Sequence, residues 1–230
     1  MSTEEQKRLN KHLALQLGVS RREADNLIDA GKVIINDKPA TLGARFMPGD
    51  IIKVNNEVLA DDTGYQYLAF HKPVGYVCSR RQQGDNPTIY ELIPQQYHHL
   101  KPVGRLDRDS SGLILLSNDG DFAFRMTHPK FAKTKIYNVR LEHELSPLHQ
   151  QMINDHGINL EDGKSQLRLE RMNETDRKSW IVTMTEGRNR QIRRTFGALG
   201  YTVEKLHRTN FGNYTIGDIK VGEFQTVDIH

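Results

Sequence analysis

One stretch of the chain joins a charged turn to an apolar segment: Gly104-Arg105-Leu106-Asp107-Arg108-Asp109-Ser110-Ser111-Gly112-Leu113-Ile114-Leu115-Leu116. The apolar run predicts a buried strand over residues 113–117. An aspartate in a glycine-bounded turn usually hydrogen-bonds its own backbone. This turn, however, opens directly onto the buried strand. The stretch therefore predicts that Asp107 presents its carboxylate from a rigid platform.

Two further segments supply an aromatic ring and a group of cations. Lys135-Ile136-Tyr137 lies in a predicted strand and presents a tyrosine. Glu186-Gly187-Arg188-Asn189-Arg190-Gln191-Ile192-Arg193-Arg194 places four arginines at the start of a predicted helix. The sequence contains no H-E-x-x-H motif, no paired C-x-x-C and no phosphate-binding glycine loop. These residues indicate covalent chemistry on an anionic polymer, without a metal, a nucleotide or any other cofactor.

The composition favours a soluble cytoplasmic protein. The chain has 230 residues, a formal net charge of +3 and a mean hydropathy of -0.64. No segment approaches the ~18 consecutive apolar residues that would cross a membrane. The first residues, Met1-Ser2-Thr3-Glu4-Glu5, lack the pattern of a secretion signal. The single cysteine, Cys78, cannot form an intrachain disulfide, which fits a reducing compartment.

Positive charge is concentrated near the second of these segments. Between Glu186 and Arg208, six cations accompany two acids, although the net charge of the whole chain is small. A solvated helix face is the usual explanation of such a run. Here the glycine-containing turn, with His207 and Asn210 following, favours contact with phosphates. Asn118-Asp119-Gly120-Asp121 faintly resembles a calcium loop, but the later bidentate glutamate is missing, so a helix cap is the better interpretation.

The chain divides into two predicted domains, residues 1–60 and residues 65–230, because the polar segment 59–64 breaks the periodicity. In the first domain, Leu9, Leu13 and Leu17 recur at helical spacing, and Ser20 with Glu23 forms a capping box for a second helix. Short strands are expected at 32–36 and 51–54.

The second domain alternates strands with a few helices. Strands are predicted at 67–70, 75–79, 113–117, 136–142, 166–172 and 180–185, and helices at 119–126, 147–155 and 189–199. This pattern predicts the α+β class, with a mixed, mainly antiparallel sheet flanked by helices.

The three motifs occur in the order of a known family. G-R-L-D-x-D-S-S-G-L, K-x-Y and E-G-x-N-R-Q-I-R-R resemble the RsuA-type subfamily of RNA pseudouridine synthases, over essentially the whole chain. The resemblance implies the pseudouridine synthase fold for residues 65–230. R-L-N-K at Arg8–Lys11, S-R-R-E-A at Ser20–Ala24 and P-G-D at Pro48–Asp50 resemble the S4-type RNA-binding domain. The alternative for this first domain is a structural helix pair with incidental surface charge.

The resemblance also implies roles for four residues. It makes Asp107 the nucleophile, although attack on the ribose and attack on the pyrimidine both stay open. It makes Tyr137 the ring that stacks on the target base and assists removal of the C5 proton. It assigns Arg193 as the charge partner that keeps Asp107 ionised, since a nearby cation favours the carboxylate. Arg105 is expected to occupy the space left by the extruded base or to hold a flanking phosphate.

Further cations are expected to contact RNA. In the catalytic domain they are Arg105, Lys135, Arg188, Arg190 and Arg194, and in the first domain Lys11, Arg21, Arg22, Lys32 and Arg45. Arg188 and Arg190 are placed nearer the RNA backbone, while the role of Arg194 is left open. The competing interpretation makes all four arginines of the 186–194 segment phosphate ligands.

The predicted function is that of an rRNA pseudouridine synthase. The forms of the first and third motifs favour a uridine of the large-subunit 23S rRNA as the target. The expected partner is ribosomal RNA or an assembling ribosomal subunit, and the expected state is a monomer without membrane contact. Two alternatives stay open: a non-catalytic ribosome-assembly factor, and the same isomerase acting on 16S rRNA or tRNA. A nuclease is disfavoured because the acid cluster for two metals is missing.

Overall fold

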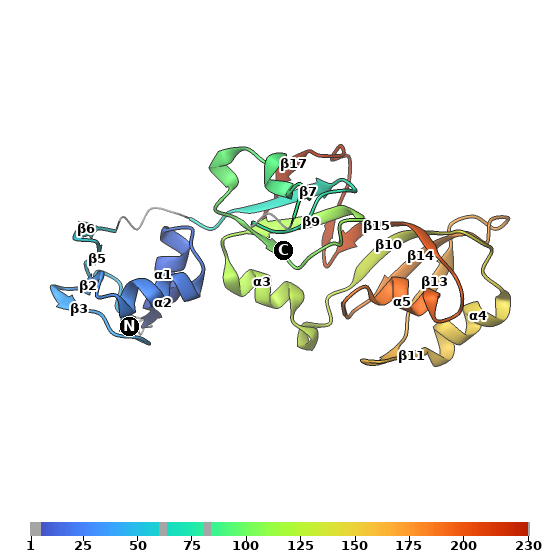
Figure 1. Cartoon of the computed structure of the whole chain (residues 1–230), viewed down its shortest axis with the longest axis horizontal. Helices are drawn as coiled ribbons and strands as arrows, with labels where there is room; N and C mark the ends of the chain where they lie inside the picture. The colour runs from blue at the N-terminus through green and yellow to red at the C-terminus, as the bar shows by residue number, and fades with distance from the viewer. Residues whose placement is uncertain (1–5, 60–63, 81–83, 230) are drawn as a thin grey trace. The chain divides into compact units, whose positions relative to one another are not determined.

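The computed structural model describes residues 6–59, 64–80 and 84–229. It divides into two compact units, Met1–Gln66 and Tyr67–His230 (Figure 1). The predicted linker at 59–64 lies mostly outside the described residues. No helix in the described ranges is both long and apolar enough to cross a membrane.

The first unit packs two helices against short strands. α1 (Leu9–Gln16) and α2 (Arg21–Asp29) bury an apolar face that continues onto Val33 and Ile52. The capping box at α2 is confirmed, because Ser20 Oγ accepts from the backbone N–H of Glu23 and the Glu23 carboxylate accepts from Ser20 N–H. A four-stranded sheet has the order β3-β2-β5-β6, and β1 pairs with β4 in a separate two-stranded sheet. The bounds are β1 Lys7–Arg8, β2 Val33–Ile35, β3 Lys38–Pro39, β4 Arg45–Phe46, β5 Ile52–Val54 and β6 Glu57–Val58.

The second unit is built on a nine-stranded sheet whose main order is β13-β14-β10-β15-β9-β7-β17. β8 pairs with β9, and β16 pairs with β15. The pairing of β9 with β15 is parallel and the other ladders of the sheet are antiparallel, which confirms a mixed, mainly antiparallel sheet. The bounds are β7 Tyr67–Lys72, β8 Lys101–Val103, β9 Ser111–Ser117, β10 Lys135–Leu141, β13 Arg168–Arg171, β14 Ser179–Met184, β15 Val203–Phe211, β16 Tyr214–Thr215 and β17 Phe224–Thr226.

Strand β9 separates two apolar cores. Successive side chains of a strand point to opposite faces of the sheet. Ile114 and Leu116 accordingly join the core that includes α5 (Gln191–Gly197), while Leu113 and Leu115 join the core under α3 (Gly120–Thr127). The remaining helical segments are α4 (Pro147–Gln151), a π-helical turn over Met152–His156, and 3-10 turns at Ile89–Glu91, Gln95–Tyr97 and Pro129–Phe131. A hairpin of β11 (Ile158–Leu160) and β12 (Gly163–Ser165) stands apart from the main sheet.

Gly112 allows the parallel junction between β9 and β15. Its φ of +108° is unfavourable for a residue with a side chain, and a Cβ at this position would lie 2.2 Å from the backbone oxygen of Arg208. The junction places the Asp107 turn, which immediately precedes β9, near the third motif, which runs into the first turn of α5. Gly112, the second glycine of the first motif, is therefore required for the pairing of β9 with β15.

The strand predictions differ from the structure at one wrong segment and at several missed strands, the longest of which is β15. The strand predicted at 75–79 is wrong: Gly75 has a φ of +96° and donates its N–H to Arg108 O, so the segment packs on the Asp107 turn and makes one isolated bridge, Val77 to Thr88. β15 was not predicted as a strand, because its Lys, His and Arg residues resemble a charged surface. The interpretation of Asn118–Asp121 as a helix cap is confirmed, since Asp119 accepts from the N–H groups of Asp121 and Phe122.

Candidate active site

All three sequence motifs of the second unit line one cavity of about 300 Å³. The Asp107 turn forms one wall and the 187–192 loop another, while β10 and β15 lie beneath, and the end of α3 contributes Thr127. Asp107, Arg105 and Arg190 also line a second cavity of about 460 Å³. Asp107 therefore stands between two spaces that can receive a ligand.

The backbone around Asp107 is held from several sides. Ser110 donates its N–H to Asp107 O at 3.1 Å, which closes a tight turn. The fully buried Lys72 donates from Nζ to Ser110 O at 2.7 Å and to Pro73 O at 2.9 Å. Burial lowers the pKa of Lys72 to about 8, against raising contributions from Cys78, Asp107 and Asp109. The Asp107 side chain keeps 32% exposure and so reaches the cavity from a fixed turn.

The partner of Asp107 is Arg190. Arg190 Nη1 lies 3.4 Å from Asp107 Oδ2, and its two terminal nitrogens also donate to the two carboxylate oxygens of Asp109, at 3.1 and 3.2 Å. Arg190 precedes the first residue of α5 and has a left-handed φ of +46°. That conformation directs its side chain away from the helix toward the Asp107 turn.

Arg193 makes its ion pair with Asp109, whereas the sequence analysis expected Asp107 as its direct partner. Its Nε lies 3.3 Å from Asp109 Oδ2, and its terminal nitrogens donate to Asp109 O at 2.9 Å and Val203 O at 2.7 Å. The reason is position, because Arg193 lies on the first turn of α5, between the Asp107 turn and the start of β15. Arg193 thus links Asp109, which lies two residues before β9, to Val203, the first residue of β15.

Asp109 is an acid that sequence reasoning missed. Burial alone would raise its pKa, but the hydrogen bonds from Arg190 and the charges of Arg193 and Arg190 lower it overall. Burial lowers the pKa of Arg193, opposed by the charge of Asp109. The clue in the sequence was the repeated acid in Asp107-Arg108-Asp109. Asp109 binds two arginines next to Asp107, and among the described residues Asp107 makes one ion pair, with the Arg190 that it shares with Asp109.

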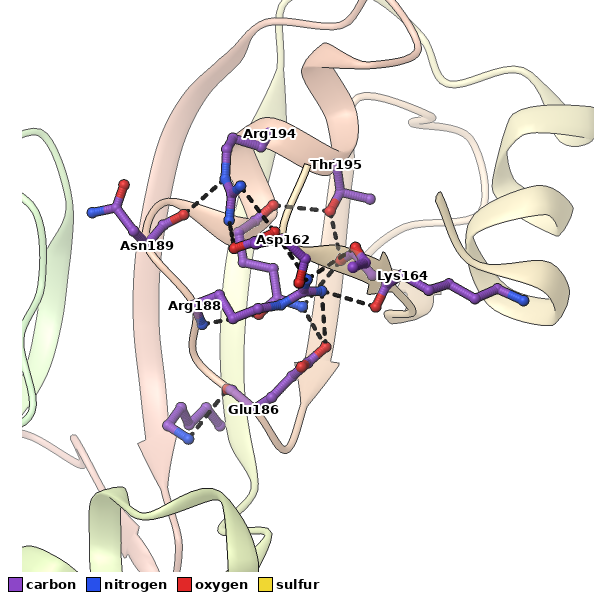
Figure 2. Close-up of polar contacts among 11 residues, drawn as sticks. Asp162, Lys164, Glu186, Arg188, Asn189, Arg194 and Thr195 are labelled. Carbon is purple, nitrogen blue, oxygen red and sulfur yellow. Dashed lines mark hydrogen bonds and ion pairs between the residues drawn. The ribbon is translucent and has the colours of Figure 1, made fainter. Parts of the chain in front are cut away.

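The other two arginines of the cluster bind the tip of the β11–β12 hairpin (Figure 2). Arg194 makes a two-point contact with the Asp162 carboxylate, at 3.0 and 2.7 Å. Arg188 donates to Asp162 O, Asp162 Oδ1, Gly163 O and Lys164 O, all at 2.9–3.0 Å. Contact of Arg188 with an RNA phosphate would require these bonds to break. The structure therefore splits the four arginines into two pairs, each held by one aspartate.

Tyr137 and two cations lie at the base of the first cavity. Tyr137 is buried in β10, opposite Arg208 of β15 and Val182 of β14. Lys135 is buried, and its Nζ donates to the carbonyls of Lys133, Thr185 and Glu186 at 3.2–3.4 Å. Burial and the nearby Arg208 lower the pKa of Lys135 to about 8, while Glu186 raises it.

Arg208 is a buried cavity residue, which corrects the interpretation of Lys205 and Arg208 as one phosphate-binding run. Arg208 is 2% exposed, donates from Nε to Leu113 O at 2.8 Å, and lies 4.8 Å from the ring centre of Phe211. Lys205, on the same strand, is exposed. Successive side chains of β15 point to opposite faces of the sheet, so Lys205 and Arg208 lie on different faces. The sequence would have shown this difference only if residues 203–211 had been predicted as a strand.

The remaining predicted RNA contacts lie on surfaces. Arg105 is exposed at the edge of both cavities. In the first unit, Arg21 and Arg22 stand exposed on the first turn of α2, and Lys32 and Arg45 are exposed elsewhere in that unit. Lys11, on α1, is half-buried.

Comparison with known proteins identifies relatives over the whole chain. Residues 66–198 match the family described as RNA pseudouridylate synthase, and residues 7–52 match the S4 domain. The ribosomal small subunit pseudouridine synthase A of Yersinia pestis is 35% identical, covering 95% of this chain and 93% of that protein. The ribosomal large subunit pseudouridine synthase B of Bacillus subtilis is 32% identical, covering 97% and 93%.

Two further comparisons agree with these. The dual-specificity RNA pseudouridine synthase RluF of Escherichia coli strain K12 is 33% identical over 95% of this chain and 74% of its own length. A crystal structure of a pseudouridylate synthase is 30% identical and superposes with a TM-score of 0.68, covering 96% of both chains. The family match spans Asp107, Tyr137 and the 187–192 segment of the cavity, while Leu206, Arg208 and Phe211 lie beyond it.

Proposed function

The chain belongs to the RNA pseudouridylate synthase family, and from this premise we propose that it isomerises one uridine of ribosomal RNA, with Asp107 as the nucleophile. The observation that carries the proposal is the position of the Asp107 carboxylate on a fixed turn, facing the same cavity as the Tyr137 ring. The ion pair with Arg190 fixes the direction of the carboxylate that would make the nucleophilic attack.

The reaction leaves the composition of the RNA unchanged. The bond between uracil N1 and ribose C1′ breaks, the base turns within the cavity, and C5 forms the new bond to C1′. The proton lost from C5 is balanced by a proton gained at N1. Asp107 forms and then loses a covalent bond to the substrate, which divides one difficult step into easier ones. Tyr137, buried at the base of the cavity, keeps the detached base stacked and assists removal of the C5 proton.

A uridine in folded RNA has to leave its stack before it reaches such a cavity. Arg105 supports this step, because it is exposed at the cavity edge and lies two residues before Asp107. We assign Arg105 to the space that the base vacates or to the flanking phosphate. The exposed cations of the first unit add attraction to the RNA backbone.

Ribosomal RNA is the substrate class that the relatives support, since they are named for the small subunit, the large subunit or dual specificity. We propose a uridine of the large-subunit RNA, on the forms of the G-R-L-D-R-D-S-S-G and E-G-R-N-R-Q-I-R-R motifs. A target uridine in the small-subunit RNA or in tRNA would be revealed by the pseudouridine mapping experiment described below.

The test maps pseudouridine across rRNA and tRNA from cells with and without the gene, and then restores wild type, Asp107→Asn or Asp218→Asn. Asp218 is an exposed aspartate outside both cavities, so its variant is the matched control. We expect one uridine to lose its modification, to regain it with wild type and Asp218→Asn, and to stay unmodified with Asp107→Asn. Near-normal modification by Asp107→Asn would refute the nucleophile assignment. An unchanged map after deletion would refute the proposed substrate.

A further inference from the structure

Three aromatic rings gather on the surface where α3 ends. Phe124 and Phe131 meet edge to face, with ring centres 5.7 Å apart, and His128 lies 4.6 Å from Phe124. The exposed fractions of Phe124 and Phe131 are 46% and 37%, and His128 is also exposed. Lys130 Nζ lies 5.1 and 4.8 Å from the two phenylalanine ring centres. We call these four residues the aromatic cluster.

The surroundings of the aromatic cluster are basic. Residues 124–135 contain Arg125, Lys130, Lys133 and Lys135 and no acidic residue. Arg125 lies 4.0 Å from the Asp119 carboxylate, at the limit of an ion pair. Exposed rings interleaved with cations suit a ligand that offers flat faces and negative charge together, and a single-stranded nucleic acid does so. An apolar peptide or a lipid tail carries no negative charge for these cations to bind.

The cluster is continuous with the catalytic cavity. Thr127, between Phe124 and His128 in the chain, lines the cavity. A Cβ on Gly104, in the Asp107 turn, would lie 3.5 Å from the methyl group of Thr127. At the other end of the segment, Lys133 O accepts a hydrogen bond from the cavity residue Lys135. The aromatic cluster is therefore within reach of a nucleotide that neighbours a base in the cavity.

We propose that the aromatic cluster is a stacking site for an unpaired nucleotide that neighbours the target uridine, with Lys130 bound to the adjoining phosphate. The incoming base lies against the phenylalanine faces and Lys130 moves from the rings to the RNA backbone. This inference rests on the proposed RNA substrate, and it adds a contact outside the cavity that helps to hold the substrate while its uridine is extruded.

The test uses a short, uridine-free, single-stranded oligoribonucleotide that carries 2-aminopurine, whose fluorescence falls when it stacks. Wild type should quench it on binding. The double variant Phe124→Leu and Phe131→Leu should bind about fivefold or more weakly, because a lost base stack costs about 1–3 kcal/mol per base. Phe131→Tyr, which keeps the ring, should retain the wild-type affinity. Lys130→Gln should lower the log–log salt slope by up to about one unit.

The control is Leu148→Ala, which removes an exposed apolar side chain, 65% exposed, from α4. Fluorescence of the buried Trp180 verifies that each variant stays folded. The proposal is overturned if wild type does not bind or quench the probe, if the double variant binds as wild type does, or if the control loses as much. Pseudouridine formation is scored separately. Quenching of the probe without pseudouridine formation would contradict the proposed function and leave the stacking site intact. Pseudouridine formation without quenching would contradict the stacking site and leave the proposed function intact.

Discussion

Asp109 and Asp162 distribute the four arginines that the sequence presents as one cluster. Asp109 holds Arg190 and Arg193 beside Asp107, and Asp162 holds Arg188 and Arg194 on the hairpin tip. The exposed ion pairs add little to stability by themselves. Their importance lies in geometry, because each pair fixes the direction of side chains that border the cavity.

Replacing Arg190 and Arg193 in turn should separate chemistry from stability. Arg190→Ala should lower the rate of the chemical step by about tenfold or more, because Asp107 loses its ion pair, while the melting temperature changes little. Arg193→Ala should lower both the rate and the melting temperature, because Arg193 is 12% exposed and joins β9 to β15. Single-turnover rates and thermal unfolding would measure the two effects. Arg168→Ala, at an exposed arginine paired with Glu170, is the control. Equal loss of stability in both variants would contradict the division.

The buried lysines predict a basic limit to RNA binding. The pKa values of Lys72 and Lys135 are about 8, below the ordinary 10.5. Affinity for RNA should therefore fall as pH rises through about 8, because Lys135, which lines the cavity, loses its positive charge. Between about 8 and 10.5 the unfolded chain binds more protons, so these two groups make the fold more stable as pH rises.

Binding of an rRNA stem-loop, measured from about pH 7 to about pH 9, would test this limit. Lys135→Met should weaken binding at neutral pH and reduce the pH dependence. Lys53→Met, at a half-buried lysine paired with Asp37 in the first unit, should leave the pH dependence unchanged. A wild-type affinity that is constant across this range would show that the lysines contribute no titrating charge.

At the scale of elements, the parallel contact of β9 with β15 assembles the site. β9 begins four residues after Asp107, and β15 carries Leu206, Arg208 and Phe211 under the cavity. The close approach is possible because Gly112 has no side chain. Gly112, a glycine of the first motif, is thus required for the packing of these two strands.

Gly112→Ala should destabilise the second unit by about 2–4 kcal/mol, because the new methyl group meets the Arg208 backbone and the φ is unfavourable. Gly197→Ala is the matched control, since its added Cβ meets nothing within 4 Å and its φ is ordinary. It should be neutral or slightly stabilising, as alanine favours a helix. Urea unfolding of both variants gives the comparison. Wild-type stability in Gly112→Ala would mean that the strands can separate without cost.

At the scale of the whole molecule, each of the two units has its own apolar core. A unit with its own core can fold independently. In the described part of the chain, the residues that line the Asp107 cavity all belong to the second unit. The first unit carries exposed cations, and residues 7–52 of it match the S4 domain.

Removal of residues 1–66 should leave a folded second unit that binds RNA less tightly. The log–log salt slope should fall by up to about one unit for each lost phosphate contact. Circular dichroism and RNA binding at several salt concentrations would measure both effects. Arg21→Gln with Arg22→Gln in the full chain should reproduce part of the smaller slope. Aggregation of the shortened chain, or an unchanged slope, would contradict this division of tasks.

Local signals in the sequence were sufficient for much of the fold. The Ser20–Glu23 capping box, the cap of α3 at Asp119 and the apolar run of β9 depend on neighbours along the chain, so they could be read before folding. The order of the three motifs likewise identified the family. Tertiary structure alone decided that Arg190 faces Asp107, that Asp162 holds Arg188 and Arg194, and that Arg208 is buried. These contacts join residues that lie far apart in sequence, and their partners depend on strand pairing and on the left-handed backbone at Arg190.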